Sequence, residues 1–361
     1  MPLIMNAEVD TLNGLAPRAC ELCHRRDGLM RCGACQAVYY CGRECQAADR
    51  EEHKIPCKVI KKARLHYERE YEKLRDLPGD FLTPEKVFET QVGHFWGILE
   101  TRPYMRARYG LVDALLLSYG TAGGPVDAVQ TALDHLLDML RLSRSDNMGV
   151  RQLVPSLYVR LGRDQDAYDF IKWNTATSKD SSYDYGDTSL SYLDIKNADV
   201  FESPDDAWLN ERWMDLSHVV AVALIKVRIL LGLEAMQNAE VALRGAVPAE
   251  IVELIRGQLV GSPMAVRPHI LLTKPTETAE LTDEIRGHIR ALYRAVQGYN
   301  AHFWKILVEE PDAGVLQRPS GPYGQRTREE ALLMTSYSYA AWYETPGAVS
   351  VLRSLARINF K

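Results

Sequence analysis

Apolar residues recur at intervals of three and four along most of the chain beyond residue 80, and the alternating pattern typical of strands is scarce. Such spacing puts apolar side chains on one face of a helix, where they can pack against other helices. Signals for helix ends and starts divide the pattern. The sequence TAGGP at residues 121–125 places a proline at a helix start. Gly162 is expected to end one helix, and Asp164 to cap the next. The sequence predicts helices at residues 85–99, 104–119, 125–142, 147–162, 164–173, 207–232, 234–244, 248–259, 280–297, 299–308, 327–343 and 347–357.

Ahead of these segments, residues 58–76 carry charges of both signs at nearly every turn. This pattern predicts a solvated helix, which the sequence LPGD at residues 77–80 then breaks. We therefore expect residues 60–80 to form a connecting helix and linker, followed by one large helical domain over residues 81–361.

Part of the helical region has features of a repeat. The stretch LYVRLGRDQDAYDFI at residues 157–171 resembles a tetratricopeptide-type helical hairpin, with Gly162 where the helices approach, Ala167 at their crossing and Phe170 as the filling aromatic. The triplet HFW occurs at residues 94–96 and again at 302–304, although no regular period connects the two. The expected fold class is mainly α, with a tetratricopeptide-like array over most of the chain.

Between the two halves of this region lies an acidic stretch, residues 174–206. Seven aspartates and one glutamate face only two lysines there, which gives a net charge of -6. We expect a solvated acidic loop, with docking of a basic partner as the alternative. The aspartates lack the register of a calcium-binding loop, so a metal site is not expected.

Composition fits an ordinary globular protein: 361 residues, 46% hydrophobic and 25% charged, with a net charge of -5. It excludes a mainly disordered, collagen-like or membrane protein, since the longest apolar run, residues 219–233, contains Lys226 and Arg228 and is too short for a bilayer. Residues 1–17 lack a secretory signal and read as a disordered segment. We therefore expect a location in the cytoplasm or nucleus and no membrane partner.

All seven cysteines lie within the first 57 residues. Together with one histidine they form four close pairs of metal-ligand type, enough for two closed tetrahedral zinc sites. His24 is a competing ligand, but it lies outside the pair spacing. Spacing alone leaves open whether the first four and last four ligands pair in order or interleave. The predicted ligands are Cys20, Cys23, Cys32, Cys35, Cys41, Cys45, His53 and Cys57.

Residues 20–57 resemble a MYND-type zinc finger, including the stretch YYCGRECQAADREEHKIPC. The resemblance implies a finger domain over residues 18–59 with interleaved ligands. One Zn²⁺ would be held by Cys20, Cys23, Cys41 and Cys45, and the other by Cys32, Cys35, His53 and Cys57. Closed sites leave no position for water, so both ions are expected to be structural. Because Pro56 disfavours helical geometry at Ile55, we expect the helix that carries His53 to end there.

MYND fingers are protein-interaction modules, and several recognise short proline-rich peptides. The family usually has a tryptophan three residues before the histidine ligand, where this chain has Arg50. The family glutamine after the sixth ligand is present as Gln46, and Gly33 replaces a serine that some peptide-binding members have. The resemblance therefore implies a peptide partner at the finger, without its sequence preference.

Longer phrases such as TRPYMRAR and REEALLMTSYSYAAWYETPGA make the whole chain similar to uncharacterised fungal MYND-finger proteins with a helical C-terminal region. That similarity brings no activity. The expected function is a non-enzymatic scaffold or adaptor in transcriptional or developmental regulation, with a second, unknown partner at the helical domain.

Two rival functions are disfavoured. A SET-type lysine methyltransferase would need a second cysteine cluster and an asparagine-histidine-serine-cysteine motif, and neither occurs. The motifs of nucleophilic, nucleotide-binding and metalloprotease sites are also absent. A DNA-binding regulator would need a strong positive field, but residues 18–62 carry ten Lys and Arg against six Asp and Glu. Metal-bound thiolates would lower that excess to about +1, too little for a phosphate footprint.

Overall fold

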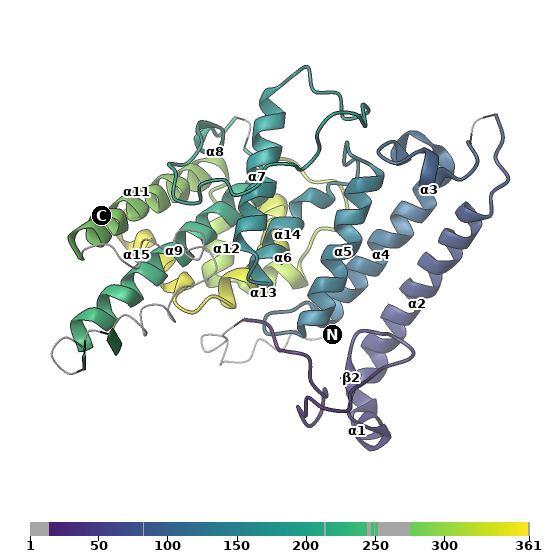
Figure 1. The fold of residues 1–361 in the computed structure, drawn as a ribbon, viewed down its shortest axis with the longest axis horizontal. Helices are drawn as coiled ribbons and strands as arrows, with labels where there is room; N and C mark the ends of the chain where they lie inside the picture. Colours follow the sequence, from purple (N-terminus) through teal and green to yellow (C-terminus); the bar gives the residue numbers. More distant parts are fainter. Residues whose placement is uncertain are drawn as a thin grey trace. The chain divides into compact units, whose positions relative to one another are not determined.

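The computed structural model describes residues 14–81, 83–212, 214–243, 247–248, 250–251 and 275–359. A small cysteine-rich segment is followed by helices with little sheet, which confirms the expected mainly α fold (Figure 1). The chain divides into two compact units: Gly14–Leu157 with Asp180–Tyr192, and Tyr158–Lys179 with Leu193–Lys361. This division does not coincide with the boundary expected near residue 80.

The first unit is built around three long helices that run up, down and up beside one another (Figure 1). Each has an apolar face toward its neighbours, with Ile60, Leu111 and Leu133 among the buried residues. Short helical turns connect the C-terminal end of the first long helix to the start of the second long helix. The elements of this unit are β1 (Met30–Arg31), β2 (Tyr39–Tyr40), α1 (Arg43–Ala48), α2 (Arg50–Arg75), α3 (Val87–Thr90), η2 (Phe95–Gly97), η3 (Leu99–Thr101), α4 (Arg102–Tyr119), α5 (Val126–Leu142) and η4 (Val150–Gln152).

The cysteine-rich segment shares its hydrophobic core with these helices. Its buried side chains form one continuous cluster with side chains of α2, α4 and α5. The members are Cys20, Cys32, Cys35, Ala37, Val38, Tyr40, Ile60, Leu111, Ala114, Leu115, Tyr119 and Ala128. Since about forty residues bury little apolar surface by themselves, this shared core adds to the stability that metal binding provides.

The described part of the expected disordered segment, residues 14–17, is anchored to the same unit. The backbone N–H of Ala16 donates to the carbonyl of Gly124 at 2.9 Å, and the N–H of Val126 donates to the carbonyl of Ala16 at 2.9 Å. Arg18 then forms an ion pair with Asp127 at the start of α5. These contacts hold the chain where disorder was expected, and residues 1–13 lie outside the described residues.

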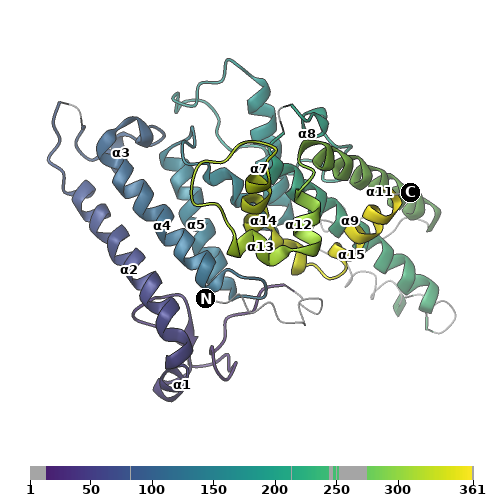
Figure 2. The same ribbon diagram turned by 180° about the vertical axis from the view of Figure 1, so that it is seen from behind.

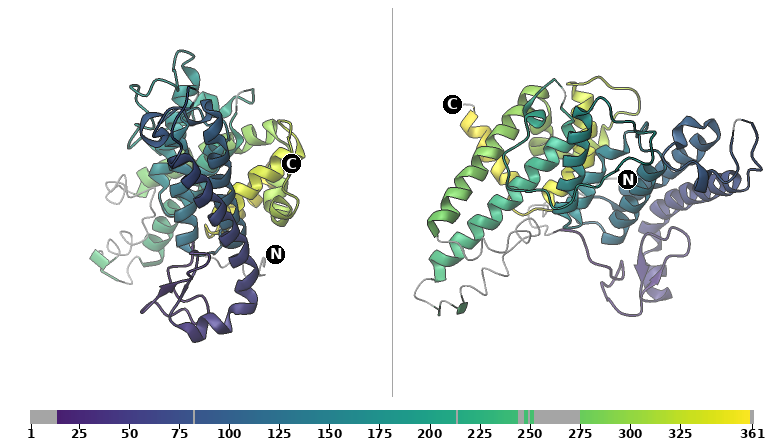
Figure 3. Two further views of the ribbon diagram at one scale, coloured as in Figure 1. Left: turned by 90° about the vertical axis from the view of Figure 1, so that its right-hand side faces the viewer. Right: turned by 45° about the horizontal axis from the view of Figure 1, so that its top comes forward.

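The second unit surrounds α9, whose apolar residues lie on every side rather than on one face. Helices α7, α11, α14 and α15 pack around it, as Figures 2 and 3 show for α9 and α11. A helix with this pattern belongs in the centre of a core. Helix α6 (Val154–Arg160) leads into the unit, which contains α7 (Asp164–Lys179), α8 (Asp206–Leu209), α9 (Leu216–Leu243), α11 (Pro275–Tyr299), α12 (Phe303–Glu309), α13 (Pro311–Leu316), α14 (Arg328–Tyr343) and α15 (Ala348–Asn359).

Some predicted helices differ from the structure. Residues 85–99 form only α3, η2 and the first residue of η3, because Gly93 takes φ +94° and its backbone pairs with Leu142, the last residue of α5, and with Arg144 just beyond it. The helix expected at 147–162 begins at Val154, after Gly149 at φ +68°. The two helices expected at 207–232 and 234–244 are instead the short α8 and one long α9. Most of the helix expected at 248–259 lies outside the described residues.

The acidic loop is shorter than expected and well anchored. Helix α7 extends to Lys179, so the loop begins at residue 180. The fully buried Lys226 of α9 donates to the carbonyl oxygens of Val200, at 2.8 Å, and Glu202.

Within the described residues, no helix is long and apolar enough to cross a membrane.

We predict that one buried ion pair stabilises the second unit. Arg160 donates to both carboxylate oxygens of Glu344, at 2.9 and 2.7 Å, and both side chains are 3% exposed. Replacing Glu344 by alanine leaves a buried guanidinium without this partner. Glu344→Ala should therefore lower the free energy of unfolding by about 3–5 kcal/mol, measured by urea denaturation.

The control is the exposed pair Arg163–Asp166, whose side chains are 40% and 42% exposed. Asp166→Ala should cost less than about 1 kcal/mol, because water screens this pair. Equal losses in the two variants would contradict the importance of the buried pair.

Candidate metal centres

Two tight turns of the same construction begin the two metal-ligand groups. In each, the N–H of the residue after the second cysteine donates to the carbonyl of the first, from His24 to Cys20 and from Gln36 to Cys32, both at 2.9 Å. His24 and Gln36 take φ of 57° and 58°, which turns the chain sharply. Each turn therefore points both cysteine side chains to one side.

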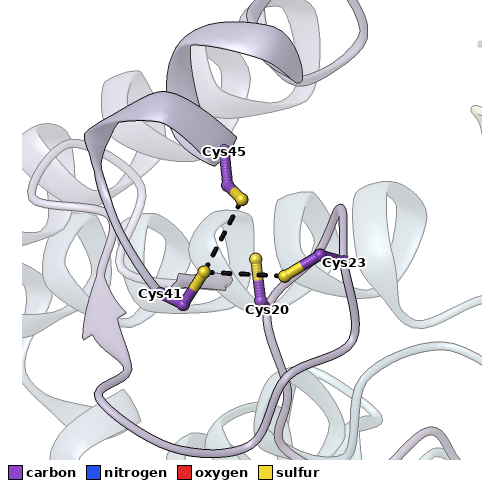
Figure 4. Close-up of side chains that lie close together, drawn as sticks. All are labelled: Cys20, Cys23, Cys41 and Cys45. Atoms are coloured by element: carbon purple, nitrogen blue, oxygen red, sulfur yellow. Dashed lines mark hydrogen bonds between the residues drawn. The ribbon is translucent and has the colours of Figure 1, made fainter.

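The first group joins Cys20 and Cys23 to Cys41 and Cys45, at the start of α1 (Figure 4). Their sulfur atoms face one another: Cys23 Sγ lies 3.5 Å from Cys41 Sγ, which lies 3.6 Å from Cys45 Sγ. Cys20 is fully buried and Cys23 is exposed. The group therefore lies at the edge of the unit, with one side toward solvent.

The second group joins Cys32 and Cys35 to His53 and Cys57, which lie four residues apart on successive turns of α2. The Nε2 atom of His53 lies 3.4 Å from Cys32 Sγ and 3.8 Å from Cys35 Sγ. Cys32 Sγ lies 3.9 Å from Cys57 Sγ. The two groups therefore interleave along the sequence, as the family resemblance implied, and sequential pairing is excluded by the geometry. His24 joins neither group.

Both groups have the dimensions of a zinc site. A tetrahedral ion with Zn–S bonds of about 2.3 Å places its sulfur ligands about 3.8 Å apart. All four ligand atoms of each group lie within 4.8 Å of one another, and the neighbour distances given above fall between 3.4 and 3.9 Å. Thiolate and imidazole donors are the ligands that zinc prefers. The residues therefore fit one four-coordinate ion in each group.

Electrostatics within the groups also favours a cation. Burial opposes ionisation of Cys32, but N–H groups of Cys35 and Ala34 outweigh it and lower its pKa to about 6. Its neighbour Cys35 behaves in the opposite way: burial, and then the charges of Cys32 and Cys57, raise its pKa to about 12. In the first group, the hydrogen bond with Cys41 is the largest cause that raises the pKa of Cys45 to about 12. Several thiolates this close repel one another unless a divalent cation lies between them.

The histidine ligand is oriented by a residue of α4. With Nε2 facing the cysteines, Nδ1 lies 2.7 Å from the hydroxyl of Tyr119, which is buried at the end of α4. A metal-bound imidazole carries its proton on the other nitrogen, so Nδ1 donates and the tyrosine oxygen accepts. Sequence reasoning missed Tyr119, because it lies 66 residues from His53 and matches no ligand motif.

Two further residues of the finger have defined positions. Gln46 of α1 donates from Nε2 to Cys32 Sγ at 3.8 Å, which ties the helix that carries Cys45 to the second group. Tyr40 donates to the Asp49 carboxylate at 2.5 Å and packs edge-on against His53. Arg50 is exposed at the first residue of α2.

The expectation that the His53 helix ends at Ile55 is wrong. Helix α2 continues through Pro56 to Arg75. Proline removes one backbone hydrogen bond, but Pro56 is buried, and Ile60 on the next turn belongs to the shared core. Packing of the helix body against α4 therefore overrides the local preference.

Comparisons with known proteins agree with this site. Residues 20–57 match the family model of the MYND finger. The chain is 44% identical over 55 residues to N-lysine methyltransferase SMYD2-A of Danio rerio, over 15% of this chain and 12% of that protein. It is 25% identical over 116 residues to histone-lysine N-methyltransferase ASHR1 of Arabidopsis thaliana, over 28% and 24% of the two chains. It is 45% identical over 38 residues to Egl nine homolog 1 of Mus musculus, over 10% of each.

These matches span about a tenth to a quarter of the length of the curated relatives. No solved structure matches the chain. The similarity to these relatives is therefore local, and the family model places its finger at residues 20–57.

We predict that Tyr119 strengthens metal binding through His53. Tyr119→Phe keeps the ring in the core and removes the acceptor of the imidazole N–H. Zinc affinity of the second site should fall about 10- to 100-fold, measured by competition with a chromophoric chelator. The control is Tyr343→Phe in the second unit, where the hydroxyl donates to the Leu307 carbonyl and should leave zinc affinity unchanged.

We also predict that the two groups support the helices unequally. Cys35 is 2% exposed and belongs to the shared core, whereas Cys23 is exposed. Hydrogen exchange at the C-terminal end of α4 should therefore increase in Cys35→Ser and change little in Cys23→Ser, with α9 amides as the internal reference. Equal exchange in both variants would contradict this unequal support.

Proposed function

We propose that this protein, in which residues 20–57 form a MYND finger, is a non-enzymatic adaptor. Two structural zinc ions would fix the shape of the finger, and its surface would bind a short peptide segment of a partner protein. Clustered free thiols need a reducing compartment, so the proposal assigns the protein to the cytoplasm or nucleus.

The observation that carries the proposal is the closure of both ligand groups. Each supplies four protein ligands, and a four-coordinate zinc ion in such a site has no open position for water or substrate. A metal bound in this way can stabilise a fold, but it cannot polarise a substrate or activate water. The finger therefore supports recognition better than chemistry.

The finger surface supports a peptide preference different from that of proline-binding relatives. The position usually held by tryptophan carries the exposed Arg50. The ring of Tyr39 is covered by Arg18 and Arg31, whose guanidinium carbons lie 5.0 and 5.5 Å from its centroid. A bare aromatic face is the usual platform for proline rings, and neither position provides one.

Methyl transfer is not proposed. Two of the relatives are methyltransferases by name, but the matches cover only 12% and 24% of their lengths. Activity is a property of a site rather than of a shared small domain, so it does not pass to this chain through the finger.

We predict that the full-length protein contains two zinc ions and binds peptides only while it holds them. Metal analysis should give two zinc ions for each chain, and peptide binding should be lost after chelation. Arg50→Trp should raise affinity for proline-rich peptides by up to about tenfold, because an exposed indole restores an aromatic platform.

Binding is measured by fluorescence anisotropy with panels of proline-rich and acidic peptides. Lys73→Trp, at the far end of α2, is the control for an added exposed indole. The proposal fails if the zinc-loaded protein and the Arg50→Trp variant bind no peptide of either panel.

A further inference from the structure

A groove of about 1020 Å³ lies between α2 and α4 of the first unit. On the α2 side it begins at Lys58, one residue after the zinc ligand Cys57, and extends to Arg69. That length corresponds to three turns, or about 16 Å of helix. The groove therefore has the dimensions of a site for a short helical segment.

The groove has an exposed apolar lining. Val59 and Leu65 of α2 are 49% and 50% exposed, and Leu117 of α4 is 45% exposed. Single exposed apolar residues are ordinary, but here three line one depression together with Ala114. This is the kind of surface that accepts apolar side chains from a partner.

Positive charge borders this lining on the α2 side. Lys58, Lys61, Lys62 and Arg69 line the groove, and Asp113 is the one acidic residue among those that line it. Within the part of the chain that the structure describes, no ion pair is found for any of the three lysines. An apolar strip with unpaired cations on its rim complements an apolar strip flanked by carboxylates.

The glycine at the middle of α4 keeps the groove open. Gly110 is exposed, and a Cβ atom added there would meet no other atom within 4 Å. Glycine is unfavourable inside a helix, by about 1 kcal/mol relative to alanine. Its presence here leaves room above α4 that any larger residue would fill.

We propose that this groove binds an acidic amphipathic helix of a partner protein. Leucine-type side chains at positions i, i+3, i+4 and i+7 would contact the apolar lining, and carboxylates on the side toward α2 would face the lysines. Nucleic acid is the less suitable occupant, because a phosphate backbone has no use for the apolar strip. The acidic loop of this chain is held elsewhere: Arg144, just beyond α5, donates to the carbonyls of Asp187 and Leu190 at 3.2 and 3.1 Å.

This inference deepens the proposed adaptor function, since it adds a second binding surface with a partner of defined chemistry. It does not depend on the peptide surface of the finger. If peptides bind the finger but no acidic helix binds the groove, this inference alone is overturned. If the acidic helix binds the groove but no peptide binds the finger, only the finger proposal is overturned.

The test uses the zinc-loaded full-length protein and a labelled synthetic helix in which leucines follow the i, i+3, i+4, i+7 pattern and glutamates fill most other positions. Fluorescence anisotropy should give a Kd in the micromolar range, and this Kd should increase as salt is added. Gly110→Phe should weaken binding at least tenfold by filling the groove, and Lys62→Glu should weaken it by reversing a charge.

Two variants of the second unit are matched controls. Gly287 of α11 is also an exposed helical glycine with open space around it, so Gly287→Phe tests the general effect of the substitution. Lys305→Glu on α12 changes the net charge as Lys62→Glu does. Both should bind the probe like the unchanged protein.

Three results would overturn the proposal. One is a Kd weaker than about 1 mM for the probe. Another is equal binding of a scrambled peptide of the same composition, which would show charge attraction without a helical fit. The last is tighter binding of duplex RNA with the same sensitivity to Gly110→Phe, which would assign the groove to nucleic acid.

Discussion

One side chain, His53, connects the metal chemistry of this protein to its helical core. Its Nε2 atom faces the cysteines of the second ligand group, and its Nδ1 atom lies 2.7 Å from Tyr119 of α4. The helix that carries it, α2, is 26 residues long and packs against α4. Because the same helix supplies two ligands and a packing face, the position of the finger on its unit is fixed by the metal site and by the core together.

This arrangement changes how the energy of folding is distributed. An isolated finger would depend almost wholly on its ions, because it buries little apolar surface. Here Cys32 and Cys35 are at once metal ligands and members of the apolar cluster that includes Leu111 and Leu115 of α4. Repulsion among the thiolates without a cation would therefore act on the helices too, and metal binding and helix packing stabilise one cooperative structure.

The sequence predicted the structural features that local residues determine, and missed those that depend on contacts between distant residues. Ligand identity followed from spacing, and the finger followed from a family resemblance. Helices such as α4 and α5 followed from apolar periodicity and their flanking signals. The effect of Pro56 was misjudged, because burial against distant residues outweighs its local cost. Gly93 ended a predicted helix through pairing with residues some fifty positions later, and Tyr119 matched no motif. Contacts between segments far apart in the sequence decide all three features: the continuation of α2 through Pro56, the break at Gly93 and the contact of Tyr119 with His53.

A finger built on a long packed helix also constrains what the proposed adaptor could do. A flexible linker lets two binding surfaces search for their ligands independently, and the gain from binding both then depends on linker length. On α2, the exposed Arg50 of the finger and the groove that begins at Lys58 belong to one rigid element. Their separation is set by helical rise, so a partner that contacts both must present its two segments at a matching distance. Selectivity for such a partner then depends on the separation of its two segments as well as on charge. A partner with only one matching segment gains no affinity from the other surface.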